Sequence, residues 1–226
     1  MDRPYSKLEP VVIPRIFLAT PMHKDSRIHG ETAVYCSYVA NQRFTQWGYT
    51  STISPEMSRN TLIEDHTHNV KADEWTHVYF IDTDVVPQQL CLENLLALDA
   101  DVCVGVYPLF LLNHGFKWSV TDMDRNLLLM SEPLPKESFE TRSAGAGCLL
   151  VRREVLEDIG WPYFKMIYQP KWENNGNAIK SMEDMYFFDK VTEKGYKIIC
   201  DPKEICKHYN SVDLLSAYRN AVHVLG

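Results

Sequence analysis

Short apolar segments rich in β-branched and aromatic residues alternate along this chain with longer segments of helical periodicity. This alternation favours an α/β fold, in which a mostly parallel sheet is covered by helices on both faces. We expect strands near residues 12–19, 49–53, 76–81, 101–106, 144–151 and 196–200. We expect helices near residues 31–47, 55–70, 87–98, 153–159 and 181–194, and a terminal helix from about 212.

Turn-forming residues set several of the expected boundaries. Thr20-Pro21 follows the first strand as a stop signal, and Gly48 follows the first helix as a C-terminal cap. Pro87 can open the third helix, because the first helical position needs no amide partner. Gly160 ends the short helix over 153–159. The stretch 161–180 contains Asn-Asn-Gly-Asn and is predicted to be a mobile loop.

Residues 113–142 interrupt the alternating pattern. Phe116, Trp118 and Val120 alternate with polar residues, the stretch 122–124 can turn, and residues 127–130 return as a second apolar stretch. This pattern predicts a small antiparallel hairpin inserted before the main sheet resumes.

Composition narrows the classes of protein that fit. The 226 residues are 45% hydrophobic and 23% charged, which is ordinary for a globular protein of one large domain or two small ones. The formal net charge of −7 argues against general electrostatic binding of nucleic acid. No apolar run approaches the roughly 20 residues of a membrane helix, and the first residues do not resemble a signal peptide. We therefore expect a cytoplasmic protein with no integral membrane segment.

The six cysteines show no C-x-x-C spacing, and most of them lie in apolar segments. Buried free thiols in a reducing compartment are the simplest interpretation. A zinc site at Cys200 and Cys206 would need two more ligands, of which His208 is one candidate.

The most informative motif is Asp82-Thr83-Asp84, directly after the apolar segment 78–81. Ligands of open α/β sheets bind at the carboxyl ends of the strands, where these two acids stand. Two unpaired carboxylates repel each other there, and a bound Mg²⁺ or Mn²⁺ relieves the repulsion. In the alternative interpretation, the acids only precede the helix that Pro87 opens.

A second pair of acids, Glu183-Asp184, begins the helix over 181–194. Asp184 could act there as a base toward an acceptor hydroxyl. In the alternative interpretation, Ser181 and Asp184 form a capping box with no role in catalysis.

Two further features are weaker when taken alone. His208 follows the last expected strand and could complete a metal site, although a lone histidine is usually structural. Gly145-Ala146-Gly147 consists of small residues that allow a ligand or a strand to approach closely. It is not a dinucleotide-binding fingerprint, because the third glycine and the turn from strand to helix are missing.

In their order along the chain these motifs resemble those of GT-A glycosyltransferases, closest to the broad family-2-like group. The resemblance covers residues 12–210. It implies a GT-A (Rossmann-like) mostly parallel sheet flanked by helices, in a single domain over 1–226. The nucleotide-binding half would cover about 10–110, and the acceptor and catalytic half about 111–226.

The resemblance also implies a role for each matching residue. Asp82, Asp84 and His208 match metal ligands for Mn²⁺ or Mg²⁺, with Asp84 the more direct ligand. Asp184 matches the catalytic base of inverting relatives, with Glu183 beside it. The residues that match donor-binding positions for a nucleoside-diphosphate sugar are Thr20, Arg59, Asn60, Asp82, Gly145, Ala146 and Gly147.

The implied activity is metal-dependent transfer of a hexosyl or pentosyl group from a nucleotide sugar to an acceptor hydroxyl. The acceptor is open among a glycan, a protein, a small molecule and a modified nucleic-acid base. Trp161, Tyr163, Phe164, Tyr168 and Trp172 could stack on a sugar or a base, or could simply pack within their loop.

Two other functions remain open: a sugar nucleotidyltransferase, or a non-catalytic module that binds a sugar nucleotide. A nucleotidyltransferase usually carries a glycine-rich phosphate loop after the first strand, and here no glycine follows until Gly30. The Gln-x-x-Arg-Trp motif of processive polysaccharide synthases is absent, which argues against that activity. Both retention and inversion of the sugar's configuration are compatible with these residues.

Overall fold

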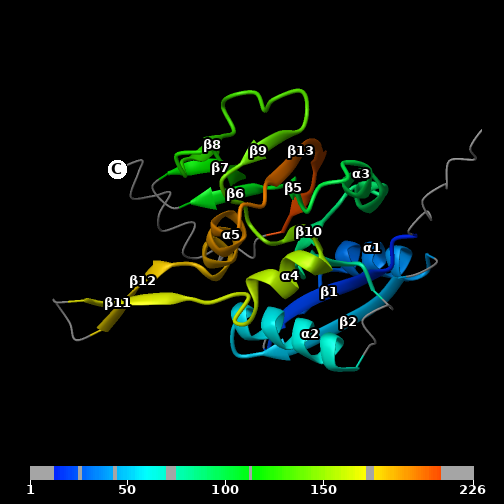
Figure 1. The fold of residues 1–226 in the computed structure, drawn as a ribbon. Helices are drawn as coiled ribbons and strands as arrows, with labels where there is room; N and C mark the ends of the chain where they lie inside the picture. The colour runs from blue at the N-terminus through cyan, green and yellow to red at the C-terminus, as the bar shows by residue number, and fades with distance from the viewer. Residues whose placement is uncertain are drawn as a thin grey trace, which may run out of the picture.

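A seven-stranded sheet crosses the centre of the protein in the order β2–β1–β3–β10–β5–β13–β9 (Figure 1). The computed structural model describes residues 13–24, 27–42, 45–69, 75–111, 114–171 and 176–209. The strands of this sheet are β1 (Ile16–His23), β2 (Thr45–Thr52), β3 (His77–Ile81), β5 (Val102–Val106), β9 (Phe139–Thr141), β10 (Cys148–Arg152) and β13 (Ile198–Ile205).

Most strands of the sheet run in one direction. β1 is parallel to β2 and to β3, and β13 is parallel to β5. β10 is antiparallel to both β3 and β5, so β3 and β5 point the same way on either side of it. β9 is antiparallel to β13. The carboxyl ends of β1, β3, β5 and β13 therefore meet at one edge of the sheet, as the expected α/β fold requires.

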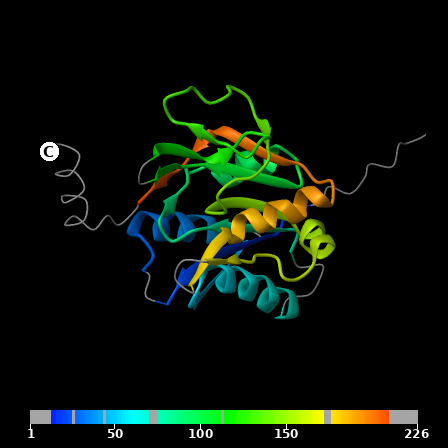
Figure 2. The same ribbon diagram turned by 90° about the vertical axis from the view of Figure 1, so that its left-hand side faces the viewer.

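Helices cover both faces of the sheet (Figures 1 and 2). α1 (Gly30–Ala40) and α3 (Cys91–Ala97) pack on one face. α2 (Pro55–Asn69), α4 (Arg153–Ile159) and α5 (Glu183–Glu193) pack on the other. Alternate side chains of each central strand enter opposite cores: Val78 and Phe80 face α2, whereas Tyr79 and Ile81 face α1. Central strands covered on both faces must be apolar at every position, which explains their continuously apolar sequence.

Three smaller antiparallel sheets surround the central one. The predicted hairpin is present as β7 (Gly115–Thr121) and β8 (Leu127–Leu129), and β6 (Pro108–Leu111) extends it to three strands. β4 (Val85–Val86) pairs with β14 (Lys207–His208).

β11 (Ile167–Lys171) and β12 (Gly176–Ser181) pair as a ribbon that extends away from the sheet (Figure 1). The prediction of a loop over 161–180 is therefore wrong for the two strands. These two strands pair with each other and not with the central sheet, so they lack the apolar sequence by which strands are recognised.

The first helix ends earlier than predicted. It stops at Ala40, and Gly48 lies inside strand β2 rather than at a helix cap. A Cβ atom at Gly48 would lie 2.7 Å from the ring of Phe17, so the absence of a side chain lets this ring pack under β2. The ring is held from its other side by His66, with 3.7 Å between the ring centroids. Gly48 is thus required for packing within the sheet, although its place after a helical pattern in the sequence resembles that of a helix cap.

Other boundaries differ for identifiable reasons. β1 continues through Pro21 to His23, because beyond Ala19 it pairs only with β2 and the proline needs no second partner. Helix α3 begins at Cys91, four residues after Pro87. Val12 and the expected terminal helix from 212 lie outside the described residues.

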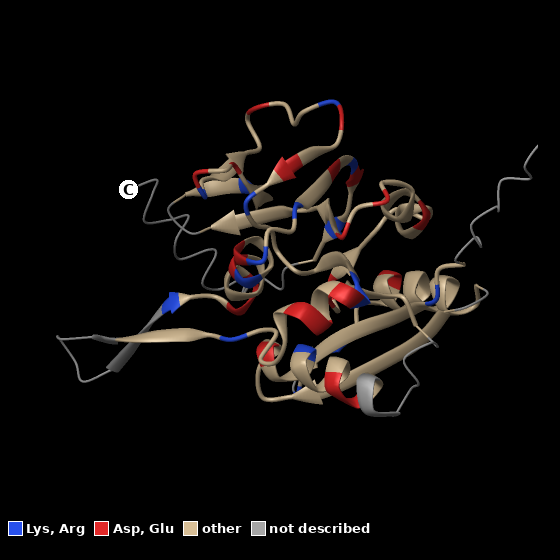
Figure 3. Ribbon diagram, in the orientation of Figure 1, with Lys and Arg blue, Asp and Glu red and all other residues tan. Residues whose placement is uncertain are grey.

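Charged residues are concentrated on the helices, the loops and the insertion, and the central strands β1, β3 and β5 carry none (Figure 3). In the described ranges, no helix combines the length and the apolar character that crossing a membrane requires.

We expect Gly48→Ala to lower the free energy of unfolding by about 1 to 3 kcal/mol, because the new methyl group overpacks Phe17. Urea unfolding followed by circular dichroism measures the change. Gly30→Ala is the matched control, because a Cβ atom at Gly30 has no neighbour within 4 Å. Equal losses of stability in the two variants would contradict the packing role of Gly48.

Candidate active site

Strand β3 delivers Asp82 to the carboxyl edge of the sheet. The Asp82 amide donates to the Gly147 carbonyl at 3.1 Å, and the Val85 amide donates back to the Asp82 carbonyl at 3.2 Å. This turn carries Thr83 and Asp84 out of the sheet and leads into β4. The carbonyl of Thr83 accepts from the His29 amide at 2.7 Å, which ties the start of α1 to the same edge.

Arg59 of α2 binds two of the predicted acids at once. Its Nη2 donates to both Asp82 carboxylate oxygens, at 2.6 and 2.9 Å, and its Nη1 donates to Glu183 Oε1 at 2.8 Å. Only 3% of Arg59 is exposed, so its charge depends on these partners. The family resemblance implied that Arg59 binds the nucleotide. In the structure its guanidinium links one acid of the first pair, Asp82, to one acid of the second, Glu183.

Glu183 and Asp184 stand at the start of α5 with different surroundings. Glu183 is buried, and its second oxygen, Oε2, has no hydrogen-bond partner among the described residues. Asp184 accepts from the Met185 amide at 2.7 Å. The residue before the helix is Met182, with no side-chain cap, and the Ser181 hydroxyl donates to the Met182 carbonyl at 3.4 Å. The capping-box interpretation is therefore wrong.

The surroundings of Asp184 suit a general base. Burial, followed by the negative charge of Glu183, raises the pKa of Asp184 to about 6, although Arg59 acts in the opposite direction. Burial also raises the pKa of Asp82, with Asp84 and Glu183 adding to the effect and Arg59 opposing it. The site thus holds more negative charge than its one buried guanidinium compensates.

The short pairing of β14 with β4 brings His208 against Asp84. Val85 and His208 are partners in this ladder, and the Tyr209 amide donates to the Asp84 carbonyl at 2.9 Å. His208 Nδ1 lies 2.8 Å from the Pro108 carbonyl, which can only accept, so Nδ1 carries a proton. Nε2 then faces Asp84 Oδ2 at 3.6 Å. The contact with Asp84 is the main factor that raises the pKa of His208, and burial opposes it.

Tyr107 is a buried residue of the site that the sequence analysis did not identify. It follows β5, which runs parallel to β3, so it emerges at the same edge. Its hydroxyl oxygen accepts from the Gly147 amide at 3.2 Å. Burial and the charges of Asp82 and Asp184 hold its pKa well above the usual range, so the phenol stays protonated. The sequence feature that could have identified Tyr107 is its position directly after the continuously apolar segment 102–106.

The glycines of 145–147 make this arrangement sterically possible. A Cβ atom at Gly145 would overlap the Tyr107 hydroxyl. A Cβ atom at Gly147 would lie 2.9 Å from the same hydroxyl and 3.0 Å from Asp82 Oδ2. Ala146 between them is buried. The small residues therefore allow strand β10 to start directly against the acids.

Thr20 and Asn60 use their polar groups within the protein. Thr20 is buried in β1, where its hydroxyl accepts from Trp47 Nε1 at 3.0 Å. The side-chain amide of Asn60 donates to the Phe164 carbonyl at 2.7 Å, and its oxygen accepts from the amides of residues 163 and 164. Asn60 thus anchors the loop that follows α4 rather than joining the acids.

The five aromatic residues of the 161–172 stretch divide in the structure. Tyr163 and Phe164 are buried, and Phe164 stacks on Phe187 with centroids 4.7 Å apart, as the loop-packing interpretation requires. Trp161 and Tyr168 are exposed by 68% and 54%. Trp172 lies outside the described residues.

The side chains around Asp84 fit a hard divalent cation. His208 donates Nδ1–H to a carbonyl, as metal-ligating histidines usually do, and this leaves Nε2, which faces Asp84, as its possible ligand atom. The Asp84 side chain is 45% exposed and free of Arg59, whereas both oxygens of Asp82 accept from Arg59. Asp84 is therefore better placed than Asp82 to be a direct ligand.

Comparison with known proteins identifies the fold. No family model and no curated protein matches the sequence. The structure of A197 from STIV is similar, with a TM-score of 0.59 and 18% identity, over 87% of this chain and 86% of that chain. GalNAc-T7, solved with UDP, GalNAc and Mn²⁺, is similar with a TM-score of 0.50 and 11% identity, over 90% of this chain and 45% of that chain. The chain thus has a fold like that of a GT-A glycosyltransferase.

We expect Arg59→Met to lower the free energy of unfolding by about 3 to 5 kcal/mol at pH 7, because Asp82 and Glu183 would keep buried, uncompensated charges. The deficit should shrink as the pH falls and the Asp82 carboxylate, whose pKa burial raises, takes up a proton. Thermal and urea unfolding at pH 7 and pH 5 measure both effects.

Arg125→Met is the control, because Arg125 pairs with Asp189 at the surface and such a pair contributes at most about 1 kcal/mol. A deficit in Arg59→Met that does not change with pH would contradict the electrostatic role of Arg59.

Proposed function

We propose that this protein is a metal-dependent glycosyltransferase that moves a sugar from a nucleoside-diphosphate sugar to an acceptor hydroxyl. The proposal rests above all on the excess of carboxylates over cations at the carboxyl edge of a sheet of this fold. Four acids share this edge with one buried guanidinium and one histidine: Asp82, Asp84, Glu183, Asp184, Arg59 and His208.

Asp84 and His208, with Asp82 nearby, would hold Mn²⁺ or Mg²⁺. Carboxylate oxygens and an imidazole nitrogen suit these cations. When bound, the ion supplies positive charge to the diphosphate of the donor and to the nucleotide as it departs. The neighbour GalNAc-T7 was solved with UDP and Mn²⁺, which is compatible with this assignment.

Arg59 would act in donor binding through Asp82, because its guanidinium fixes the orientation of that carboxylate. The Asp82 oxygens are then available at their exposed side to the ribose or the metal. Gly145, Ala146 and Gly147 would contribute to donor binding by letting the Tyr107 hydroxyl and Asp82 pack against the start of β10. Thr20 and Asn60 would shape the nucleotide side indirectly, since their polar groups bind the protein itself.

Asp184 would remove the proton from the acceptor hydroxyl. A base with a pKa near the working pH is efficient, and burial brings Asp184 close to this condition. Glu183 would hold the start of α5 in place through Arg59. This division of roles corresponds to an inverting reaction within one domain, with its nucleotide-binding half over about 10–110 and its acceptor half over about 111–226. Trp161 and Tyr168 belong to the acceptor half and are exposed, so either could stack on a glycan, a protein, a small molecule or a modified base.

We expect slow, Mn²⁺-dependent release of nucleoside diphosphate from one member of a panel of UDP-, GDP-, CDP- and dTDP-sugars without acceptor. Asp84→Asn should lower this rate roughly 100-fold or more, because the metal is worth several kcal/mol of charge stabilisation. Asp99→Asn is the control, since Asp99 is exposed and pairs with Arg152 at the opposite edge of the sheet. A rate unchanged in Asp84→Asn would contradict the assigned metal site.

Two other results would favour the other functions. Release of pyrophosphate from a nucleoside triphosphate and a sugar phosphate indicates a nucleotidyltransferase. Tight, metal-dependent binding of a sugar nucleotide without release, on any acceptor, indicates a binding module.

We expect transfer to the acceptor to rise with pH and to level off above a midpoint no higher than about 6, because Asp184 must be unprotonated to accept the hydroxyl proton. A cation at Asp84 moves the midpoint downward. Asp184→Asn should lower kcat about 10² to 10⁴-fold and remove this pH dependence. Donor binding, measured by calorimetry, should change little. A variant that keeps the pH profile of the wild type would show that another group is the base.

A further inference from the structure

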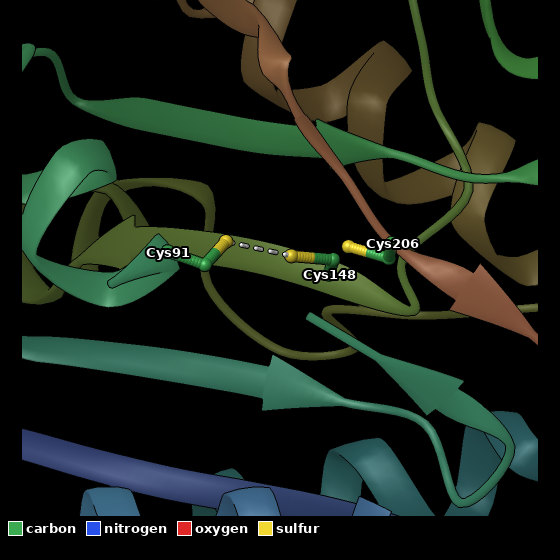
Figure 4. A group of neighbouring side chains, drawn as sticks. All are labelled: Cys91, Cys148 and Cys206. Atoms are coloured by element: carbon green, nitrogen blue, oxygen red, sulfur yellow. Dashed lines mark hydrogen bonds between the residues drawn. The ribbon is translucent and has the colours of Figure 1, made fainter. Parts of the chain in front are cut away.

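Three cysteines that are far apart in the sequence meet behind the carboxyl edge of the sheet (Figure 4). The sulfur atoms of Cys91, Cys148 and Cys206 all lie within 4.8 Å of one another, and those of Cys91 and Cys148 are 3.7 Å apart. Cys91 begins α3, Cys148 begins β10, and Cys206 follows the end of β13. Figure 4 shows the side chains of Cys91 and Cys148 pointing toward each other, with Cys206 beside them.

The separations match those of thiolates that share one metal ion. With metal–sulfur bonds of about 2.3 Å, ligand sulfurs stand about 3.8 Å apart in a tetrahedral site and about 4.0 Å apart in a trigonal one. The observed 3.7 Å pair and the 4.8 Å limit bracket these values. The three sulfurs are therefore already close to the spacing that one ion requires.

Hydroxyl groups continue the cluster on one side. Tyr79 Oη lies 3.7 Å from Cys148 Sγ, and Tyr35 Oη lies 3.0 Å from Tyr79 Oη. A phenol that donates to a sulfur stabilises the thiolate form, as outer-shell donors do in metal sites. Tyr79 Oη is also within reach of the fourth position of a tetrahedral site, since oxygen and sulfur ligands of one Zn²⁺ stand roughly 3.5 Å apart.

The backbone leaves space for the sulfurs. A Cβ atom at Gly105 would lie 2.9 Å from Cys148 Sγ and 3.4 Å from Cys206 Sγ, so any larger residue there would press on both. The three cysteines are exposed by 1% or less. Such burial excludes three bare thiolates, because their charge would have no compensation, whereas a bound Zn²⁺ neutralises two of the three charges and a bound Cu⁺ one.

We propose that Cys91, Cys148 and Cys206 form a binding site for one thiophilic cation, Zn²⁺ or Cu⁺, separate from the proposed catalytic metal site. Binding replaces the three thiol protons, which are released to solvent. Thiolates select soft cations, whereas the oxygen-rich set at Asp84 and His208 selects Mn²⁺ or Mg²⁺. The two sites therefore load different ions.

The location gives this ion a structural role. Cys148 directly follows Gly147, which contacts Asp82, and Cys206 precedes His208 by two residues. A cation at the three sulfurs would link β10, β13 and α3 immediately behind these residues. Loss of the ion should lower the melting temperature by roughly 5 to 10 °C, as expected for a ligand held at about 100 times its dissociation constant.

The test is the metal content of the full-length protein without an affinity tag. The protein is unfolded under reducing conditions, freed of metal, and refolded with Zn²⁺ or with Cu⁺ in separate samples, because the site is closed in the folded state. We expect about one equivalent of Zn²⁺ or Cu⁺ per chain to survive dialysis against a chelator. A large excess of Mn²⁺ should not displace it.

Single substitutions then locate the ion. Cys148→Ala should lose the bound metal, whereas Cys200→Ala should keep it, because Cys200 is an equally buried thiol that lies outside the three-sulfur cluster. Asp84→Asn should also keep the thiophilic ion, so this outcome is independent of the catalytic proposal. Tyr79→Phe separates the cations: it should weaken Zn²⁺, which needs a fourth ligand, more than three-coordinate Cu⁺, which loses only the hydrogen bond to the Cys148 thiolate.

A measurement on the wild type alone decides the matter if Cys148→Ala does not fold. Refolding with Co²⁺, as a coloured substitute for Zn²⁺, should give a sulfur-to-metal charge-transfer absorption. The proposal is overturned if the wild type retains neither Zn²⁺ nor Cu⁺ and shows no such absorption with Co²⁺. It is equally overturned if mass spectrometry of the native protein finds a Cys91–Cys148 disulfide and no metal.

Discussion

The geometry of the site depends on the buried guanidinium of Arg59. Removing a charge of this kind from water is costly, and the cost is offset only if the partners are close and well oriented. Arg59 meets this condition with a two-oxygen contact to Asp82 and a single contact to Glu183, all at 2.6 to 2.9 Å. It thereby joins α2, the end of β3 and the start of α5, three elements that the sheet alone would not hold in a fixed relation. The orientation of one acid in each pair, Asp82 and Glu183, follows from this one side chain.

A second interaction, the pairing of β4 with β14, fixes Asp84 and His208 relative to each other. The two-residue ladder between β4 and β14 is too short to be stable by itself, and it exists because β13 delivers residue 206 beside β5. Once formed, it presents His208 to Asp84 and fixes the imidazole through the Pro108 carbonyl. Lys207 and Tyr209 extend the same contact by binding Glu31 of α1. Backbone pairing therefore holds Asp84 and His208, whereas the buried ion pair holds Asp82 and Glu183.

The sequence was most informative where local chemistry decides structure. Continuously apolar segments located the central strands, and two acids directly after such a segment had to emerge at a sheet edge. It was less informative where distant contacts decide: Gly48 resembles a helix cap until Phe17 is known to pack beneath it. Likewise the ribbon over 167–181 forms by pairing with itself despite its polar sequence. The role of Arg59 as a bridge and the place of Tyr107 follow from strand order, which composition and periodicity do not specify.

The same strand order brings two chemically different donor sets to one region of the protein. Gly147 and Cys148 are adjacent in sequence, yet one abuts a carboxylate and the other joins two thiols in the core on the α1 side. After β13, Cys206 and His208 are separated by one residue, and between them the chain turns from the core to the exposed edge. The oxygen-rich set is open to solvent, as a site that exchanges substrate must be, whereas the sulfur set is closed. Accessibility and ligand softness thus act together: an ion that enters from solvent reaches the carboxylates, and only an ion enclosed during folding reaches the thiols.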